Sequence, residues 1–598
     1  MARGSAADRL RMRLNREEGL KALDKVVLDY GYVEGEPYSF DDHEYQIGLL
    51  RDTALRISVR KCSQVGLSEL MVQKTLALLA SIPNIRIIFS LPTKEMAMTF
   101  SKDRFDGAIE QSDHYTGLVA AGGNSASQKK LGSSLLYVIG THGAKAAISV
   151  PAEFIISDEV DFSNETILGK LESRIRHAKT TDEFGNRGYR YRFSTPTVDG
   201  YGVDIDFQKG DQRYYMCKCE HCNKQVVPDF FQDFIVPGFD RPMIEFSRND
   251  SMESRYRMDE AWIKCPSCGK NLWASLCDPS RREWVAKHPS AHDHSYQVFP
   301  WDVPKYNAPH TVIKSIGDYP LQSDFINFVI GLPFSSAENS FFTDQVTKDR
   351  LCTVQLWIYG QYIVTAPTVG GMDIGKVCHL MVKAKVGSKT HVIWMEKISN
   401  TKDDPAAPKV LDRYDFYNMK KLCIDAGPDI TLVNTLLRAR ENIVSVVYVQ
   451  NVSGSLPIVE VKAGDQINAD RTKTLSLLLN QHNSGDILYP FKPELANELF
   501  EHFKTTKKIR ERNADGDMKD RFVRTPGADH WVHAANYAGI AMLAIDELAP
   551  STVVGVMPGV GTVKLGSGVV EIGPKPEEAG VLQGLFGVGA AAARGRRR

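Results

Sequence analysis

The sequence contains no long hydrophobic run and no excess of charge of either sign. No apolar segment approaches the ~18 residues that a membrane-spanning helix needs, so we expect no membrane contact. Lys and Arg together number 73, as do Asp and Glu. Any contact with nucleic acid must therefore come from local patches and not from a global positive field. The basic N-terminal stretch 1–19 has a helical pattern but lacks the apolar core of a signal peptide, which predicts a cytosolic protein.

Cysteine is also scarce, with ten in 598 residues. In a cytosolic protein these thiols are expected to be reduced or metal-bound and not paired as disulfides. The hydrophobic share of 43% and the charged share of 24% are typical of a globular protein. Because a single core rarely serves so long a chain, a prior of roughly 150 residues per domain predicts two to four domains.

Short apolar segments alternate with helical patterns over about the first 200 residues and again from about 366 to 548. This alternation predicts the α/β class, with parallel strands. In such sheets ligands bind beyond the carboxyl ends of the strands. Polar residues gather at such ends, after Arg60, Ser157 and Phe193.

The segment RKCSQVGLSE, residues 60–69, has the frame of a phosphate-binding loop but lacks two of its usual residues. The opening glycine is missing, and Leu67 stands where the lysine belongs. Gly66 allows the turn, and Ser68 opens a predicted helix in the Mg²⁺-binding hydroxyl position. Lys61 is the candidate for the missing charge, with Arg60 as the alternative. An ordinary strand, turn and helix also explains the segment. The candidate ATP-binding residues are Arg60, Lys61, Ser63, Gln64, Val65, Gly66, Leu67, Ser68 and Glu69, with Tyr45 and Gln46 for the base.

Two further strand ends carry residues that such a site needs. Asp158 and Glu159 follow the apolar run FIIS, where one carboxylate can hold Mg²⁺ and the other can polarise water. Ser194 and Thr195 end the strand YRYRF and could couple hydrolysis to motion. Each is also explained by an ordinary loop or turn.

Cysteines form two C-x-x-C pairs, Cys219/Cys222 and Cys265/Cys268, which together supply the four thiolates that structural Zn²⁺ prefers. The spacing between the pairs exceeds the usual 15–20 residues, so an insertion must be looped out between them. Cys217 and His221 compete as ligands, and metal-free cysteines remain the alternative.

Acidic residues mark the second α/β region. Asp373 and Asp425 are predicted at strand ends, and Asp529 starts a helix on which His533 shares its face. Three carboxylates in this order could hold two Mg²⁺ or Mn²⁺ ions ~4 Å apart, as in a ribonuclease-H-like nuclease. Taken singly, each is more often a turn or cap residue.

In chain order, the motifs SQVGLSE, IISDEVD, STPT, GLPF and MDIGK resemble those of the large terminase subunit of tailed bacteriophages, in the branch with a cysteine-containing insertion. The resemblance covers about residues 30–545. It implies a P-loop ATPase domain that drives double-stranded DNA into a capsid and a ribonuclease-H-like domain that cuts concatemeric DNA. The expected divisions are 1–204 (ATPase), 205–300 (zinc-ribbon-like insertion), 301–365 (helical connection), 366–548 (nuclease) and 549–598 (flexible tail).

By this resemblance Glu159 is the catalytic glutamate, Asp158 and Ser68 hold Mg²⁺, and Asp373 and Asp425 are nuclease ligands. The third nuclease ligand is either Asp529 or His533. The resemblance also implies, as partners, a small terminase subunit, the portal protein of the procapsid and further copies of the chain in a ring. The implied location is the host cytoplasm, with transient docking on the procapsid and absence from the mature virion. Two rival hypotheses are a helicase-like remodeller that binds DNA without cutting it and a scaffold whose sites have decayed.

Overall fold

The computed structural model describes most of the chain, and its backbone forms two compact units. The described residues are 20, 23–142, 150–336, 339–341, 368–386, 388–449, 452, 456–461, 465–489, 493–512, 518–545, 563–565 and 568–570. Unit 1 comprises Met1–Ser336 and Ile509–Lys519, and unit 2 comprises Ala337–Lys508 and Asp520–Arg598. The predicted N-terminal helix, much of the predicted connection and nearly all of the predicted tail lie outside the described residues. Where the structure is described, no helix combines the length and apolarity needed to span a bilayer.

Unit 1 is built on an 11-stranded sheet in the order β11-β10-β15-β3-β9-β8-β4-β7-β6-β5, with β14 beside β10. The pairs from β10 through β15, β3, β9, β8 and β4 to β7 are all parallel. This confirms the predicted parallel α/β class. The strands are β3 (Arg56–Lys61), β4 (Arg86–Leu91), β5 (Val119–Ser125), β6 (Gln128–Leu131), β7 (Ser134–Gly140), β8 (Phe154–Asp158), β9 (Tyr189–Ser194), β10 (Arg213–Lys218), β11 (Gln225–Val226), β14 (Arg282–Ala286) and β15 (His294–Val298).

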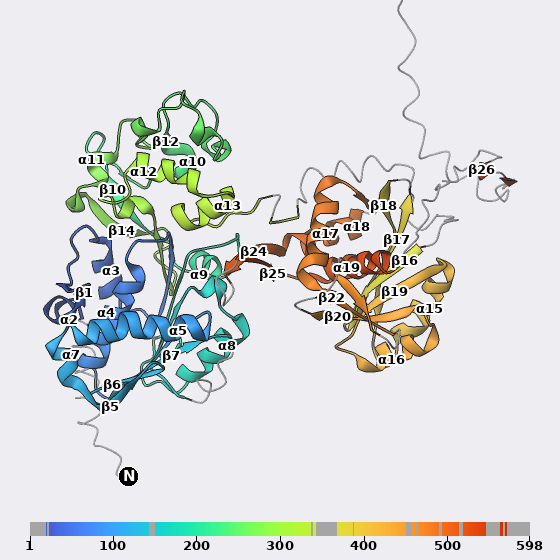
Figure 1. Ribbon diagram of the computed structural model, residues 1–598, viewed down its shortest axis with the longest axis horizontal. Helices are drawn as coiled ribbons and strands as arrows, with labels where there is room; N and C mark the ends of the chain where they lie inside the picture. The colour runs from blue at the N-terminus through green and yellow to red at the C-terminus, as the bar shows by residue number, and fades with distance from the viewer. Residues whose placement is uncertain are drawn as a thin grey trace, which may run out of the picture. The chain divides into compact units, whose positions relative to one another are not determined.

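Helices cover this sheet, and its central strands β3, β4 and β8 are almost wholly buried, as expected for parallel strands covered on both faces. In Figure 1, α4 and α5 lie along the sheet, where α5 packs on β4 and β7. The helices are α2 (Leu23–Tyr30), α3 (Tyr45–Arg51), α4 (Leu67–Ser81), α5 (Lys94–Phe100), α6 (Gly107–Glu110), α7 (Asp113–Leu118), α8 (Glu165–Glu172), α9 (Val203–Lys209), α10 (Phe230–Asp233), α11 (Trp273–Leu276), α12 (Pro309–Lys314) and α13 (Gln322–Asp324). Short strand pairs complete the unit: β1 (Tyr32–Val33) with β2 (Glu36–Pro37), and β12 (Phe234–Ile235) with β13 (Trp262–Ile263).

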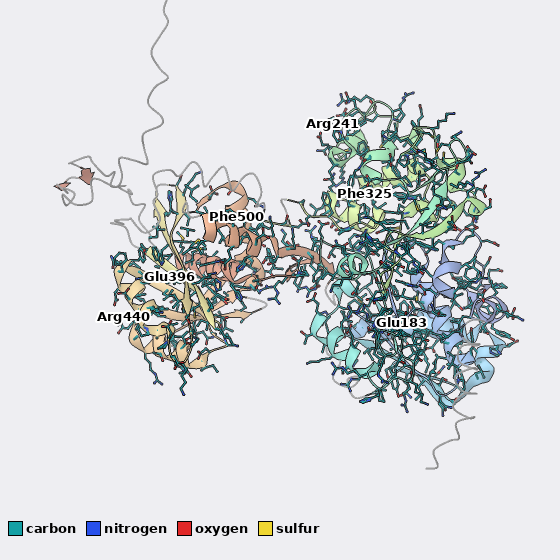
Figure 2. The ribbon with its side chains drawn as sticks, turned by 180° about the vertical axis from the view of Figure 1, so that it is seen from behind. Glu183, Arg241, Phe325, Glu396, Arg440 and Phe500 are labelled. Carbon is teal, nitrogen blue, oxygen red and sulfur yellow. The ribbon has the colours of Figure 1, made fainter. Side chains whose placement is uncertain are left out.

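The cysteine-bearing segment continues the same sheet. Its strands β10 and β15 extend the sheet beyond β3, so the sheet does not end at residue 204. A second hydrophobic cluster packs around the cysteines and includes Phe230 and Phe325, whose rings lie 5.6 Å apart. Figure 2 labels Phe325, which belongs to the segment predicted as a helical connection. Residues 205–330 therefore share a sheet with the rest of unit 1 and add a second hydrophobic cluster of their own.

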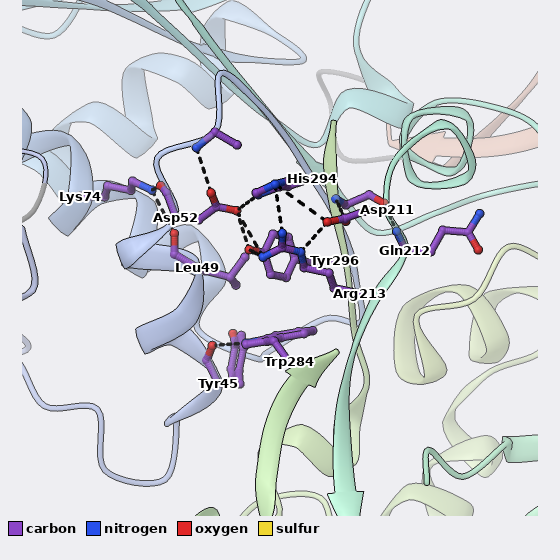
Figure 3. A network of polar contacts seen from close by, with 12 residues as sticks. Tyr45, Leu49, Asp52, Lys74, Asp211, Gln212, Arg213, Trp284, His294 and Tyr296 are labelled. Atoms are coloured by element: carbon purple, nitrogen blue, oxygen red, sulfur yellow. Dashed lines mark hydrogen bonds and ion pairs between the residues drawn. The ribbon is translucent and has the colours of Figure 1, made fainter. Parts of the chain in front are cut away.

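A buried polar network joins the end of α3 to β15, the neighbour of β3 in this sheet (Figure 3). The carboxylate of Asp52 accepts hydrogen bonds from the Tyr296 hydroxyl at 2.5 Å and the Ala54 amide at 2.9 Å, and its Oδ2 lies 2.6 Å from His294 Nδ1. Burial alone would raise the pKa of Asp52, but the bonds from His294 and Tyr296 lower it to about 2. The network thus connects α3, which precedes β3 in the chain, to β15, which pairs with β3.

Unit 2 holds an 8-stranded sheet in the order β21-β22-β20-β19-β16-β17-β18-β23. Its first three strands form an antiparallel meander, and β19, β20 and β22 add parallel to β16, which is the ribonuclease-H-like arrangement. The strands are β16 (Thr368–Asp373), β17 (Val377–Val386), β18 (Lys389–Ser399), β19 (Met419–Asp425), β20 (Ile443–Val449), β21 (Ile458–Glu460), β22 (Gln466–Asp470) and β23 (Ile487–Leu488). Two separate hairpins pair β24 (Thr506–Arg512) with β25 (Met518–Arg524) and β26 (Val563–Leu565) with β27 (Gly568–Val570).

The helix α19 lies directly on β16 because Gly371 leaves room for its backbone. A Cβ atom at Gly371 would lie 2.1 Å from the Ala538 nitrogen and 2.2 Å from the Ala534 oxygen. Side chains alternate along a strand, so Asp373 projects to the same face as Gly371, toward α19. The helices of unit 2 are α15 (Ala406–Phe416), α16 (Ile430–Ala439), α17 (Arg471–Ser484), α18 (Pro493–Lys504) and α19 (His530–Leu543). Phe500 of α18, labelled in Figure 2, lies in a core shared with α17 and α19.

Candidate functional site

The predicted phosphate loop connects β3 to α4, and its lysine faces the acidic end of β8. The Lys61 ammonium donates to Glu159 Oε1 at 2.9 Å, although the two residues are 98 positions apart. Burial alone would lower the pKa of Lys61, but the carboxylates of Glu159 and Asp158 raise it above its usual value. Lys61 is therefore a permanent cation at the start of the loop.

Arg60 points away from this acidic pair, because successive strand residues face opposite sides of a sheet. Its guanidinium forms a buried ion pair with Asp204 and a hydrogen bond with Gln297. The guanidinium carbon also lies 4.0 Å from the centre of the Phe207 ring. With these partners, Arg60 joins β3 to α9 and β15, and of the two candidate cations only Lys61 contacts the carboxylates.

Ser68 and Asp158 lie side by side at the foot of the loop. The Ser68 hydroxyl donates to Asp158 Oδ2 at 2.8 Å, and the Glu159 amide donates to Asp158 Oδ1 at 2.8 Å. Burial and the nearby Glu159 carboxylate raise the pKa of Asp158. A hydroxyl and a carboxylate this close are oxygen ligands of the kind that Mg²⁺ prefers, so these residues fit a magnesium ion.

The Ser194–Thr195 turn contacts the same glutamate. The Ser194 hydroxyl donates to Glu159 Oε2 at 3.1 Å, and the Thr195 amide donates to it at 3.3 Å. Strand β9 lies between β3 and β8, which brings the three predicted strand ends together. Glu159 itself has the left-handed backbone angle φ 50°, an uncommon conformation for a non-glycine residue and one that is often found at functional sites. The carboxylate is thus oriented by donors from two neighbouring strands.

Tyr45 and Gln46, which were predicted to hold an adenine base, contact the backbone of the phosphate loop. Tyr45 is fully buried, and its hydroxyl donates to the Val65 carbonyl at 2.6 Å. Gln46 is also buried, with its amide nitrogen 3.5 Å from the same carbonyl. Gly66 has φ 78°, which suits the left-handed turn into α4, and a Cβ there would lie 2.9 Å from Gln46. In this structure Tyr45 offers no exposed ring face to a base.

The rest of the loop is fixed by its backbone or lies at the start of α4. The Ser63 amide donates to the Phe328 carbonyl at 2.7 Å, and Gln64 takes the left-handed angle φ 60°. Leu67 is buried in the core of unit 1, which explains why a leucine is tolerated at this position. Glu69 accepts a hydrogen bond from Gln73 at 2.9 Å and forms an ion pair with Arg104 at 3.3 Å.

Asp161, which was not predicted from the sequence, holds the Ser194–Thr195 turn in place. It is completely buried and accepts hydrogen bonds from the Thr197 amide and hydroxyl and from the Val203 amide, all within 2.9 Å. Its own amide donates to the Ser194 hydroxyl at 3.3 Å. Asp161 therefore fixes the turn that contacts Glu159. The sequence signal was present as the third acidic residue of SDEVD.

The four cysteines of the two C-x-x-C pairs converge. The Sγ atoms of Cys219 and Cys268 lie 3.9 Å apart, as do those of Cys222 and Cys265, and all four lie within 4.8 Å of one another. A tetrahedron with Zn–S bonds of about 2.3 Å has edges of about 3.8 Å, so this arrangement fits zinc. The alternative ligands Cys217 and His221 do not belong to this group.

The two cysteine pairs also share one backbone pattern. The amide of Cys219 donates to the Lys224 carbonyl, and the Cys219 carbonyl accepts from Asn223. Cys265 makes the same two bonds, with Lys270 and with Gly269. Asn223 and Gly269 both have positive φ, at 57° and 73°. Two matching turns that aim their thiols at one point are what a tetrahedral metal requires.

In unit 2 the predicted acidic pair lies together at the edge of the sheet. Met372 of β16 pairs with Ile424 of the parallel strand β19, so Asp373 and Asp425 each follow at equivalent positions. Burial raises the pKa of both carboxyl groups. A positive charge on His533 would lower the pKa of both carboxyl groups.

Asp529 and His533 form a pair of their own on α19. Asp529 Oδ2 lies 3.3 Å from His533 Nε2, and Arg524 lies 3.5 Å from Asp529 Oδ1. Burial would raise the pKa of Asp529, but these neighbours lower it to about 2. Asp529 and His533 thus contact each other, and both remain candidates for the third ligand.

Two histidines that were not predicted as ligands complete this region. His530 Nδ1 lies 2.8 Å from Asp373 Oδ2. His379 on β17 is paired in register with Asp373, and its ring stacks on His530 at a centroid distance of 4.8 Å. Burial lowers the pKa of His379 to about 4, so its imidazole is neutral near pH 7. A histidine within a hairpin strand carried no sequence signal that placed it opposite Asp373.

Comparison with known proteins gives one family match and several structural ones. Residues 45–275 match the model of the phage terminase large subunit gpA, ATPase domain. No curated protein matches the sequence significantly. The HK97 bacteriophage large terminase is 11% identical, with 87% of this chain and 99% of that chain covered and a TM-score of 0.49.

Two further solved structures correspond to parts of the chain. The large terminase ATPase domain of Thermus phage P74-26 is 15% identical, covering 50% of this chain and 97% of that one, with a TM-score of 0.29. The large terminase nuclease of thermophilic phage G20c with bound magnesium is 16% identical, covering 34% and 98%, with a TM-score of 0.24. All three scores lie below 0.5, a level at which likeness supports no functional conclusion. The family match, in contrast, spans the phosphate loop, Asp158–Glu159 and the Ser194–Thr195 turn, so residues 45–275 of this chain are similar to the ATPase domain of the phage terminase large subunit gpA.

Proposed function

We propose that unit 1 hydrolyses ATP and uses the energy to move double-stranded DNA. The observation that carries this proposal is the cluster of Lys61, Ser68, Asp158, Glu159 and Ser194, which gathers a cation, Mg²⁺ ligands and a base from three strand ends. Bound Mg²⁺ would neutralise charge on the β- and γ-phosphates. Lys61 would place its ammonium on the same phosphate oxygens, and Glu159 would orient the attacking water and accept its proton.

The Lys61–Glu159 ion pair then has a mechanistic role. A lysine that binds phosphate must give up part of its contact with the glutamate, because its charge turns toward the nucleotide. Glu159 is then free to accept a hydrogen bond from water while Ser194 and Thr195 still hold its other oxygen. Lys61 at the end of β3 and Ser194 at the end of β9 both contact the Glu159 carboxylate. Movement of the Ser194–Thr195 turn and ATP hydrolysis are therefore coupled through Glu159.

The experiment for this function is DNA-stimulated ATP hydrolysis by Glu159→Gln. We expect a loss of about 10²–10³-fold in kcat with ATP binding retained, because the amide cannot accept the proton. The exposed Lys170→Ala on α8 is the control and should keep wild-type turnover. Displacement of a third strand annealed to duplex DNA measures movement, and the Glu159 variant should fail in it. Wild-type hydrolysis by Glu159→Gln would refute the assignment.

We propose that unit 2 is a metal-dependent DNA endonuclease. The adjacency of Asp373 and Asp425 at equivalent positions of parallel strands supports this, since paired carboxylates can hold divalent ions that activate water. Asp373→Asn should abolish cutting of supercoiled plasmid with Mn²⁺ while ATP hydrolysis stays unchanged. Retained cutting would favour the rival hypothesis of a domain that binds DNA without cutting it.

We further propose one structural zinc ion held by Cys219, Cys222, Cys265 and Cys268. Their sulfur geometry and matching turns support it. From the likeness of residues 45–275 to this family we also propose a ring of copies on the procapsid portal in the host cytoplasm, with a small terminase subunit as partner and no place in the mature virion. DNA contact would be with the phosphate backbone and so would weaken steeply with salt.

A further inference from the structure

Two histidine imidazoles lie beside Asp373, although Mg²⁺ binds mainly through oxygen atoms. The ligand atoms of Asp373, His379 and His530 all lie within 4.8 Å of one another. Three elements supply them: the end of β16, the facing position on β17 and the first residue of α19. We propose that Asp373, His379 and His530 form a binding site for a first-row transition-metal ion, which the site takes in preference to Mg²⁺. The role of that ion in cutting DNA rests on the nuclease proposed above.

The strongest support is a buried nitrogen with no partner. His379 is 5% exposed, and its Nδ1 has no hydrogen-bond partner within the described part of the chain. A buried polar atom is normally satisfied, so one left open beside a carboxylate and a second imidazole calls for a ligand. A metal ion accepts the lone pair of a neutral imidazole and would satisfy this atom.

The distances within the group also suit one ion. Asp373 Oδ2 and His530 Nδ1 lie 2.8 Å apart, a separation compatible with two neighbouring ligands of the same metal as well as with a hydrogen bond. The rings of His379 and His530 stack at an interplanar angle of 17°, so the two imidazoles lie next to each other beside Asp373. Gly371 brings α19 close enough to β16 for His530 to reach the carboxylate.

A second layer of side chains holds the buried histidine. His379 Nε2 lies 3.7 Å from Glu498 Oε1, and the other oxygen of Glu498 accepts from Lys397 at 2.7 Å. Metal-bound histidines commonly have a carboxylate at their second nitrogen, which orients the ring. Glu498 is thus a positioning residue, which acts on the metal only through His379.

The ligand chemistry decides which ion is favoured. Mg²⁺ binds through oxygen and usually keeps several waters, whereas imidazole suits zinc, iron, cobalt and nickel. Two imidazoles and one carboxylate leave positions open for water or a phosphate oxygen, the pattern of catalytic and not structural sites. The neighbouring Asp425 supplies carboxylate oxygens on the other side of Asp373, and Mg²⁺ or Mn²⁺ would suit that position.

The test is Co²⁺ binding to the full-length chain, followed by calorimetry with Mg²⁺ as competitor. Cobalt on the cysteines is recognised by sulfur-to-metal charge-transfer absorption, so the two sites are read separately. We expect one site outside the cysteines that a hundredfold excess of Mg²⁺ fails to empty. His530→Ala should weaken it at least tenfold and should fold, since that side chain is 46% exposed. Glu498→Gln should weaken it by about 10–100-fold.

His391→Ala is the matched control, because His391 lies on β18 of the same sheet outside the group and should leave cobalt binding unchanged. Equal cobalt affinity in wild type and His530→Ala, or ready displacement by Mg²⁺, would overturn the proposal. Plasmid cutting is the second readout, and it distinguishes the metal site from the nuclease activity. Cobalt binding by a wild-type chain that cuts no plasmid would support the metal site and refute the nuclease. Plasmid cutting together with equal cobalt affinity in wild type and His530→Ala would support the nuclease and refute the metal site.

Discussion

The ammonium of Lys61 lies 2.9 Å from the carboxylate of Glu159, so the cation of the phosphate loop and the predicted catalytic base contact each other directly. Most phosphate loops carry this lysine after the last glycine, a position that Leu67 fills here. Lys61 reaches the same acidic residues from the end of β3. We therefore propose that Lys61, at the end of β3, replaces the lysine that such loops usually carry at the start of the following helix.

Arg60 is expected to matter for stability and not for phosphate binding. Arg60→Ala leaves Asp204 as an unpaired buried charge, which should reduce the free energy of unfolding by about 3–5 kcal/mol. Thermal unfolding measures the loss. The double variant Arg60→Leu with Asp204→Leu removes both charges and should recover much of it. Unchanged stability in Arg60→Ala together with lost nucleotide affinity would instead make Arg60 the phosphate-binding cation.

The cysteine group should hold one zinc ion per chain. Metal analysis of Cys268→Ser should show zinc largely lost, because three thiolates bind far more weakly than four. The loss should also lower the unfolding temperature, since the second hydrophobic cluster of unit 1 packs around these cysteines. Cys277→Ser is the control, as Cys277 is exposed and lies outside the group. A purified chain without zinc would contradict this prediction.

Acid should weaken unit 1 through Asp52. Its pKa is about 2 in the folded chain and 3.8 when unperturbed, so the folded state favours the ionised form. The resulting stabilisation is present above pH 4 and is lost as the pH falls toward 2. From the shift it amounts to about 2 kcal/mol. Between pH 5 and 2, the unfolding temperature of wild type should fall more steeply than that of Asp52→Asn, and parallel curves would refute the assignment.

Much of unit 1 could be predicted from the sequence because its signals are local. Strand β3, the turn at Gly66 and α4 follow from apolar patterning and one glycine. Whether Lys61 or Arg60 faces Glu159 depends on how β3, β9 and β8 pair in the sheet, and a local sequence pattern does not contain that information. The burial of Tyr45 could not be read either, since an aromatic residue that supports a loop and one that stacks on a base look alike in sequence.

In unit 2 the sequence identified the acidic residues but not their surroundings. Asp373 and Asp425 were expected at strand ends, and the parallel pairing of β16 with β19 accounts for their proximity. His379 was missed because its relation to Asp373 depends on the register of an antiparallel pair. The strands of 205–300 that extend the sheet of unit 1 were missed for the same reason: pairing across the sheet is a long-range property.

The most direct measurement is DNA-stimulated ATP hydrolysis by Lys61→Met. Removing this ammonium should lower kcat/KM for ATP by at least about 100-fold, since one well-placed charge in a shielded site contributes several kcal/mol to the transition state. Lys170→Ala, which removes an exposed lysine, should keep the wild-type rate. Hydrolysis by Lys61→Met at the wild-type rate would contradict the account, because no other candidate cation of the loop contacts Glu159 within the described residues.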